Sequence, residues 1–179
     1  EKCFKELNVK KVKFQGENIT IRQMCFQNCS EISEFFIIGA INVEIGISAF
    51  EKCKKIQKIS IDVSSNLNIL ENCFSEAQSL KTIELVGNEI IVEKKAFYKC
   101  TSIQNLKFEK SKKIILKNNV FDSCTGLETI NISAETEFEA GDSSFIGATK
   151  LQTVQIKSQK VTINQSCFKN CSSMISFTI

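Results

Sequence analysis

The segment SAFEKCKKIQKISI, residues 48–61, places large apolar residues six, nine and eleven positions after a phenylalanine. The same arrangement recurs along the chain, because phenylalanines that start such a pattern follow one another every 22 to 24 residues. They are Phe4, Phe26, Phe50, Phe74, Phe97, Phe121, Phe145 and Phe168. A constant period of this length is typical of a solenoid, in which each repeat buries its apolar residues against its neighbours. Positions within a repeat are numbered from its phenylalanine, so that Ile56 lies at +6.

Two strands are predicted in each repeat. Apolar residues at +9 and +11 alternate with outward residues at +8 and +10, and a second apolar pair, such as Val43 and Ile45, lies at −7 and −5. The positions −1 and +3 around the phenylalanine are four apart, which places them on one face of a helix. The sequence therefore predicts an α/β solenoid of about eight repeats of 23–24 residues, each with two short strands and a short helical turn, stacked in parallel sheets.

The nine cysteines occupy two positions of the repeat, −1 and +3. They are Cys3, Cys25, Cys73 and Cys167 at −1, and Cys29, Cys53, Cys100, Cys124 and Cys171 at +3. Alanine takes these positions in other repeats, as at Ala49 and Ala77, and it can neither bind a metal nor form a disulfide. We therefore expect buried thiols that fill the core, although the spacing of neighbouring repeats leaves a disulfide such as Cys29 to Cys53 within reach. With no histidine and no CxxC, we expect no metal and no cofactor.

Four phrases carry a family resemblance. They are SAFEKCKKIQKISI (48–61), KAFYKCTSIQNLKF (95–108), NVFDSCTGLETINI (119–132) and SCFKNCSSMISFTI (166–179). These phrases resemble the AF-x-x-C-x-x-L-x-x-I-x-I unit of BspA-like leucine-rich repeats, which occur in bacterial and protist surface proteins. The resemblance implies a leucine-rich-repeat solenoid over 1–179, and we expect this single domain to be a fragment of a longer array. It also implies a non-enzymatic binding or adhesion module with a protein or glycan ligand, at the cell surface or secreted.

An intracellular scaffold, located in the cytoplasm, is the alternative. Nine cysteines expected to be reduced favour it, whereas five N-x-S/T sequons favour a secreted protein. A net charge of +3 and lysine clusters without interleaved aromatic residues argue against a nucleic-acid partner. The sequence has no apolar run of the length that spans a membrane, so we expect no direct insertion by this segment.

Catalysis is not expected. The chain has no histidine, no phosphate-binding loop and one carboxylate cluster, formed by Glu135, Glu137, Glu139 and Asp142. Alternating glutamates on a solvated strand face meet nothing that would raise a carboxyl pKa, as a general acid requires. Charged residues instead pair across repeats: the −8 column alternates in sign from Glu89 onward, and opposite charges on neighbouring strands stabilise a fixed register.

The outward +8 and +10 columns form the predicted partner-binding face. Its candidate residues are Glu34, Phe36, Lys58, Glu84, Asn105, Lys107, Thr129, Asn131, Thr153 and Gln155. The face changes from charged residues to neutral hydrogen-bonding residues toward the C-terminal end. Phe36 is the aromatic residue of these columns and is expected to be an exposed anchor. The alternative is the second sheet, where Ile91 and Ile115 form a small apolar pair in the outward −6 column.

Overall fold

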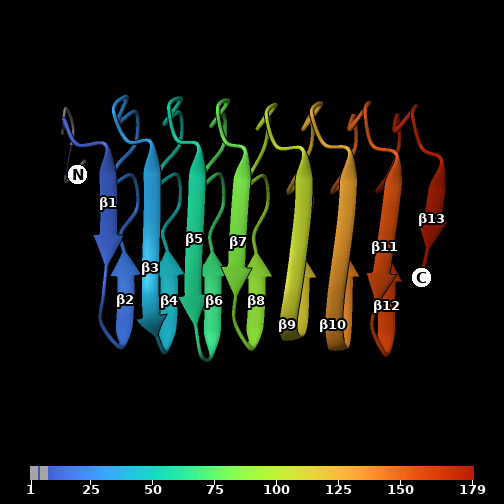
Figure 1. Ribbon diagram of the computed structural model, residues 1–179, viewed down its shortest axis with the longest axis horizontal. Helices are drawn as coiled ribbons and strands as arrows, with labels where there is room; N and C mark the ends of the chain where they lie inside the picture. The colour runs from blue at the N-terminus through green and yellow to red at the C-terminus, as the bar shows by residue number, and fades with distance from the viewer. Residues whose placement is uncertain (1–3, 5–7) are drawn as a thin grey trace.

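The computed structural model describes Phe4 and residues 8–179, which form a parallel β-solenoid of about seven turns (Figure 1). One layer of strands runs in the same direction across the front of the figure. Its members are β1 (Lys11–Phe14), β3 (Glu34–Ala40), β5 (Lys58–Val63), β7 (Thr82–Val86), β9 (Asn105–Leu116), β10 (Thr129–Ala140), β11 (Thr153–Lys157) and β13 (Ser176–Thr178). Each of these strands corresponds to the predicted +8 to +11 strand of its repeat.

A second layer lies behind the first and runs the other way in Figure 1. It contains β2 (Asn18–Ile21), β4 (Asn42–Ile45), β6 (Asn66–Ile69), β8 (Glu89–Val92) and β12 (Lys160–Ile163). β9 and β10 are long enough to continue through the bend, so that β9 pairs with both β7 and β8 and β10 with both β11 and β12. The two layers are thereby hydrogen-bonded into one folded sheet.

The strand register agrees with the columns read from the sequence. In the first layer Phe35 lies beside Ile59, and Ile59 beside Ile83, so the +9 residues form one inward column. In the second layer Asn18 lies beside Asn42, and Glu137 beside Lys160, as the −8 column requires. The strand pairs of the described residues are parallel, and identical positions of consecutive repeats therefore stack one above another.

The repeated phenylalanines form a continuous stack through the core. Along the stack from Phe4 to Phe168, the centroids of consecutive rings are 4.8 to 5.5 Å apart, and consecutive rings are within 13° of parallel. Phe50, Phe74, Phe97, Phe121 and Phe145 are fully buried. The predicted phenylalanine register is confirmed, and it sets the spacing of the solenoid.

The predicted helical turn, and with it the α/β class, is wrong. The segment around each phenylalanine is a series of turns, and the described residues contain no helix. Its −2 and +2 residues, such as Ser48 and Lys52, adopt left-handed φ angles between +53° and +74°. An α-helix needs φ near −63°, so these two residues prevent a helix from extending in either direction.

Backbone hydrogen bonds in this segment run between repeats instead of along a helix. The N–H of Phe50 donates to the carbonyl of Cys73 in the next repeat at 2.8 Å, and that of Phe97 donates to Val120 at 2.9 Å. The same bond joins Phe4 to Cys25 and Phe145 to Cys167. The turns are thus a third hydrogen-bonded side of the solenoid, which satisfies polar groups that a helix would have paired internally.

The cysteines lie where the sequence places them, in the core. Cys25, Cys29, Cys53, Cys73, Cys100, Cys124 and Cys167 are buried and Cys171 is half-buried, whereas Cys3 lies outside the described residues. Each +3 thiol has a partner that the sequence did not predict, the carbonyl of the phenylalanine one repeat earlier. The distances are 3.1 Å from Cys53 Sγ to Phe26 O and 3.2 Å from both Cys100 Sγ to Phe74 O and Cys124 Sγ to Phe97 O. A small buried side chain suffices at +3, but a thiol adds a weak hydrogen bond between repeats.

Candidate partner-binding face

All ten candidate residues lie on the first layer, in two adjacent outward columns. β3 carries Glu34 and Phe36, β5 carries Lys58 and β7 carries Glu84. The remaining residues are Asn105 and Lys107 on β9, Thr129 and Asn131 on β10, and Thr153 and Gln155 on β11. Asn105, Thr129 and Thr153 stack in one column and Lys107, Asn131 and Gln155 in the other, because the strands pair in register.

The N-terminal half of the face is held by ion pairs. Lys11 Nζ lies 3.4 Å from Glu34 Oε2, and Lys58 Nζ lies 3.0 Å from Glu84 Oε1. Lys58 therefore pairs diagonally with the next repeat's +10 residue and not with Glu34, its oppositely charged neighbour in the +8 column. The hydrogen bond from Lys58 lowers the pKa of Glu84, which stays ionised. These charges are exposed and fix the side chains without closing a pocket.

Phe36 is not the exposed anchor that the sequence predicts. Its ring is half-buried, and Lys11 Nζ lies 4.6 Å from the ring centroid, in a cation–π contact. The lysine that covers the ring comes from the preceding repeat. It lies two positions along the strand from the residue that pairs with Phe36. A partner would reach Phe36 only by displacing the Lys11 ammonium group.

The C-terminal half of the face is neutral and more open. The Thr129 hydroxyl donates to Asn105 Oδ1, which links two strands along the column. Asn131 and Gln155 are exposed and line a shallow hollow of about 440 Å³ together with Thr178 and Lys157. Amide and hydroxyl groups both donate and accept hydrogen bonds, so this region suits a polar partner.

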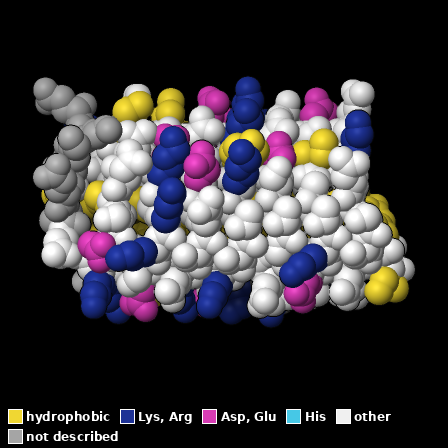
Figure 2. Space-filling model, turned by 90° about the horizontal axis from the view of Figure 1, so that it is seen from above, with side chains coloured by type: hydrophobic (Ala, Val, Ile, Leu, Met, Phe, Trp, Pro, Cys, Tyr) yellow, Lys and Arg dark blue, Asp and Glu magenta, His cyan; other side chains and the backbone are white. Residues whose placement is uncertain are grey.

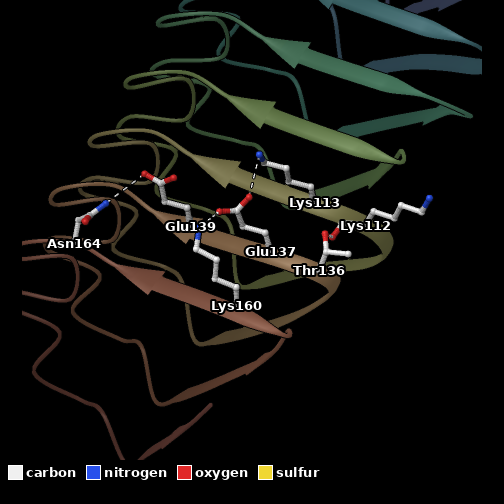
Figure 3. A network of polar contacts seen from close by, with 7 residues as sticks. All are labelled: Lys112, Lys113, Thr136, Glu137, Glu139, Lys160 and Asn164. Atoms are coloured by element: carbon white, nitrogen blue, oxygen red, sulfur yellow. Dashed lines mark hydrogen bonds and ion pairs between the residues drawn. The ribbon is translucent and has the colours of Figure 1, made fainter.

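The second layer uses its outward columns to hold the repeats in register. The Asn42 amide donates to Asn18 Oδ1 at 2.9 Å, and the Asn66 amide donates to Asn42 Oδ1 at 3.1 Å. Further along the same column the amides give way to charges (Figure 3). Glu137 lies between Lys113 and Lys160, with N–O distances of 2.9 Å and 2.6 Å.

Glu137, within the carboxylate cluster, is unsuited to the role of a general acid. Hydrogen bonds from Lys160 and Lys113 lower the pKa of Glu137, the opposite of the shift that a general acid needs. The neighbouring Glu139 accepts a hydrogen bond from the Asn164 amide, also drawn in Figure 3.

In the same layer Ile115 is only 5% exposed and Ile91 is half-buried, so the predicted apolar pair offers little surface.

Neither a metal centre nor a membrane span is found in the described part of the chain. No three His, Cys, Asp or Glu side chains gather there as ligands would. The described residues include no long apolar helix that could cross a bilayer. On the face seen in Figure 2, side chains of both charge signs are interspersed along the length of the molecule.

Two layers of parallel strands, a core of stacked phenylalanine rings and long columns of outward side chains define the chain as a repeat protein of the leucine-rich solenoid class. The BspA type leucine rich repeat region, a unit of six copies, matches residues 1–118 and 43–175. Together these matches span most of the sequence, and the chain belongs to the BspA-type leucine-rich-repeat family.

One solved structure supports the fold. A leucine-rich-repeat protein of T. pallidum has 19% sequence identity and a TM-score of 0.57, with 88% of this chain and 83% of that chain covered. A leucine-rich-repeat protein of Bacteroides ovatus has 15% identity and a TM-score of 0.48, and this chain covers 65% of its length. No curated protein has significant similarity to the sequence.

Proposed function

We propose that this solenoid is a non-enzymatic recognition module that binds a protein or glycan through the +8 and +10 columns of the first layer. The observation that carries the proposal is the contrast between inward and outward positions. Inward columns hold apolar residues in almost every turn, whereas the outward columns change from charged to neutral polar residues along one rigid face. A preformed face of this kind binds without ordering a loop, which reduces the entropic cost of association.

Within this face, the C-terminal half is the more favourable contact region. Asn131 and Gln155 are exposed beside a hollow, and no ion pair has to be broken to reach them. The N-terminal half contributes charge through Glu34, Lys58 and Glu84, which would govern orientation and association rate more than affinity. Phe36 becomes a contact only where a partner's own cationic or aromatic group replaces the Lys11 ammonium group over the ring.

The family resemblance to surface proteins supports a location at the cell surface or outside the cell. The alternative, an intracellular scaffold, is favoured by the free thiols of Cys53, Cys73, Cys100 and Cys124. Mass spectrometry of protein isolated from its native cells separates the two locations. Glycans on Asn28 or Asn170, whose side chains are exposed, support secretion, whereas intact unmodified sequons support the scaffold.

Two variants test the face. The labelled protein is applied to arrays of immobilised glycans and glycoproteins, and affinity for the strongest hit is measured by calorimetry. We expect Asn131→Ala combined with Gln155→Ala to weaken binding by at least about 1 kcal/mol, roughly fivefold, with an unchanged melting temperature. Unchanged affinity in this variant, together with a loss in Ile91→Lys, would place the partner on the second layer and reject the proposal.

A further inference from the structure

A hollow of about 560 Å³ lies at the bend between the two layers, where β9, β10 and the end of β11 turn. Lys110, Ser111, Glu135, Lys157, Ser158 and Gln159 are among its lining residues. None of them belongs to the ten candidate residues of the binding face. The hollow adjoins the one beside Asn131 and Gln155, with which it shares Lys157 and Ser158, but it opens at the bend and not on the +8 and +10 columns.

Two buried hydroxyl groups line this hollow without a hydrogen-bond partner. Among the residues that the structure describes, Ser111 Oγ and Ser158 Oγ are the buried side-chain oxygen atoms that lack one. Ser111 is 1% exposed, and its repeat-to-repeat neighbour is Ala134, which offers neither a donor nor an acceptor. A buried hydroxyl group without a hydrogen-bond partner is energetically unfavourable. Two such groups in one hollow indicate that a further hydrogen-bonding group binds there.

The backbone beside the hollow is strained in a way that positions a lysine. Lys110 has a φ of +62°, and it lies between Phe108 and Ser111, where the pairing of β9 with β10 shifts register. Three repeats earlier, the same +13 position is taken by Gly39, at a φ of +67°, where glycine has no steric cost. A strained non-glycine residue at a bulge is a feature that re-aims a side chain, and here it brings the Lys110 ammonium group to the hollow.

The charge of the rim favours an anion. Lys110 and Lys157 are both exposed, and within the described residues neither forms an ion pair. Glu135 is the acidic member of the lining, so the lining carries one net positive charge. A ligand that places a single negative charge in the hollow neutralises this net charge. A ligand with several closely spaced negative charges would be repelled by the Glu135 carboxylate.

We propose that this hollow binds a monoanionic sugar residue within a saccharide chain. The carboxylate or sulfate group lies between Lys110 and Lys157, and the sugar hydroxyls meet Gln159 and the two serines. Rotation about one side-chain bond turns either serine hydroxyl toward the ligand or a bridging water. Hydroxyl and amide groups that both donate and accept match sugar hydroxyls, which do the same, better than they match an acidic peptide.

Calorimetric titration with defined oligosaccharides tests the site. The probes are a hyaluronan hexasaccharide, which carries carboxylates, a chondroitin sulfate hexasaccharide, which carries both acidic groups, neutral chitohexaose, and hexaglutamate as an acidic peptide. We expect binding of the hyaluronan probe that weakens as salt rises from about 50 to about 150 mM, and none of chitohexaose. A stronger response to chondroitin sulfate identifies sulfate as the preferred group.

Two lysine changes give the decisive comparison. Lys110→Gly with Lys157→Gln should weaken hyaluronan binding about tenfold, and Lys110→Gly alone should raise the melting temperature by about 2 °C, because glycine relieves the strained φ. The matched control is Lys54→Gln with Lys94→Gln, which removes the same charge from exposed lysines elsewhere and should leave affinity unchanged.

The serines provide a second readout. Ser111→Ala and Ser158→Ala should raise the melting temperature of the unliganded protein, because each removes an orphaned hydroxyl, and should lower the affinity for the hyaluronan probe. An equal loss of affinity in the control lysine variant would mean that binding depends only on the overall positive charge of the protein, and it would refute the site. So would hexaglutamate binding as tightly as the saccharides, or the absence of saccharide binding at about 1 mM.

Discussion

The phenylalanine of each repeat contributes to stability in two ways. In an inner repeat such as that of Phe97, the ring is buried between the rings of Phe74 and Phe121, the N–H donates to Val120 O, and the carbonyl accepts from Cys124 Sγ. Parallel rings about 5 Å apart add a stacking contribution to the burial of a large apolar surface. A single side chain thus joins three consecutive turns of the solenoid.

Phe97→Ala should lower the free energy of unfolding by about 3 to 5 kcal/mol, because the neighbouring rings cannot collapse into the cavity it leaves. Urea unfolding followed by circular dichroism measures the loss. Phe177→Ala is the control, since this ring is 42% exposed at the end of the stack and should cost about 1 kcal/mol or less. A loss below about 1 kcal/mol for Phe97→Ala would mean that the stack does not hold the core together.

The buried thiols make stability depend on alkaline pH. Burial raises the pKa of Cys53 and Cys167 to about 12 and raises that of Cys73, Cys100 and Cys124 as well. In the unfolded chain a thiol ionises near pH 8.5, so above this pH the folded state binds more protons than the unfolded state. The stabilisation is fully present below about pH 8.5 and is lost as pH rises toward the folded pKa.

We therefore expect the free energy of unfolding to fall as pH rises above about 8.5, by up to about 1.4 kcal/mol per pH unit for each such thiol. Urea titrations between about pH 7 and pH 10 measure the slope. Cys100→Ala combined with Cys124→Ala should make the slope shallower while costing at most about 1 to 2 kcal/mol at neutral pH. The same slope in this variant would assign the pH dependence to other groups.

At the scale of the element, the turn around each phenylalanine is the least expected part of the structure. Left-handed backbone occurs at −2 and +2 in each turn from Phe26 to Phe168, yet the residues there include Met24, Lys52 and Glu76. Non-glycine residues lose energy in this conformation, so each turn stores a small strain that the inter-repeat hydrogen bonds offset.

Lys52→Gly should raise the free energy of unfolding by about 0.5 to 1 kcal/mol, because glycine adopts the left-handed conformation without strain. The repeat with Gly147 at this position already shows the arrangement. Lys54→Gly is the matched control, an exposed lysine in the same turn without a positive φ, and we expect it to be neutral or destabilising. The prediction fails where both variants change stability by the same amount, as judged from chemical unfolding.

Strand positions and register follow from the sequence because two periods agree there, an alternation of two along the strand and a repeat of about 23 residues between strands. The helical turn was wrong because the spacing of −1 and +3 fits a helix equally well, and no glycine marks the left-handed positions of most repeats. The outward columns of the candidate face were predictable, but the contact of Lys11 with the Phe36 ring and the diagonal Lys58–Glu84 pair depend on side-chain rotamers. The hollow beside Ser111 depends on the bulge at Lys110, which has no signal in the repeat pattern.

At the scale of the whole molecule, contacts join each turn to its neighbours and not to distant turns. Stability is then close to a sum of repeat and interface contributions, and the ends are less protected than the middle. The C-terminal turn illustrates this, since Val161 and Ile163 are half-buried, whereas their counterparts Ile114 and Leu116 are fully buried.

Hydrogen exchange should therefore be slowest in β5 to β10 and faster in β2, β12 and β13, because end turns open without disturbing the rest. Exchange followed by mass spectrometry at peptide resolution measures this gradient. In Phe97→Ala the protection of β7 and β9 should fall more than that of β2. Uniform exchange across all turns would indicate a globally cooperative unit instead.

The ring stack also makes the length of the molecule a multiple of one fixed step. Each repeat advances the structure by one ring spacing, near 5 Å, and every repeat meets the next through the same backbone contacts. Excising the 24 residues from Phe97 up to Phe121 would therefore join compatible ends, shorten the molecule by one step and keep all later side chains facing the same way. Duplication or loss of whole units can in this way adjust the reach of the protein in fixed increments, without any redesign of its interior.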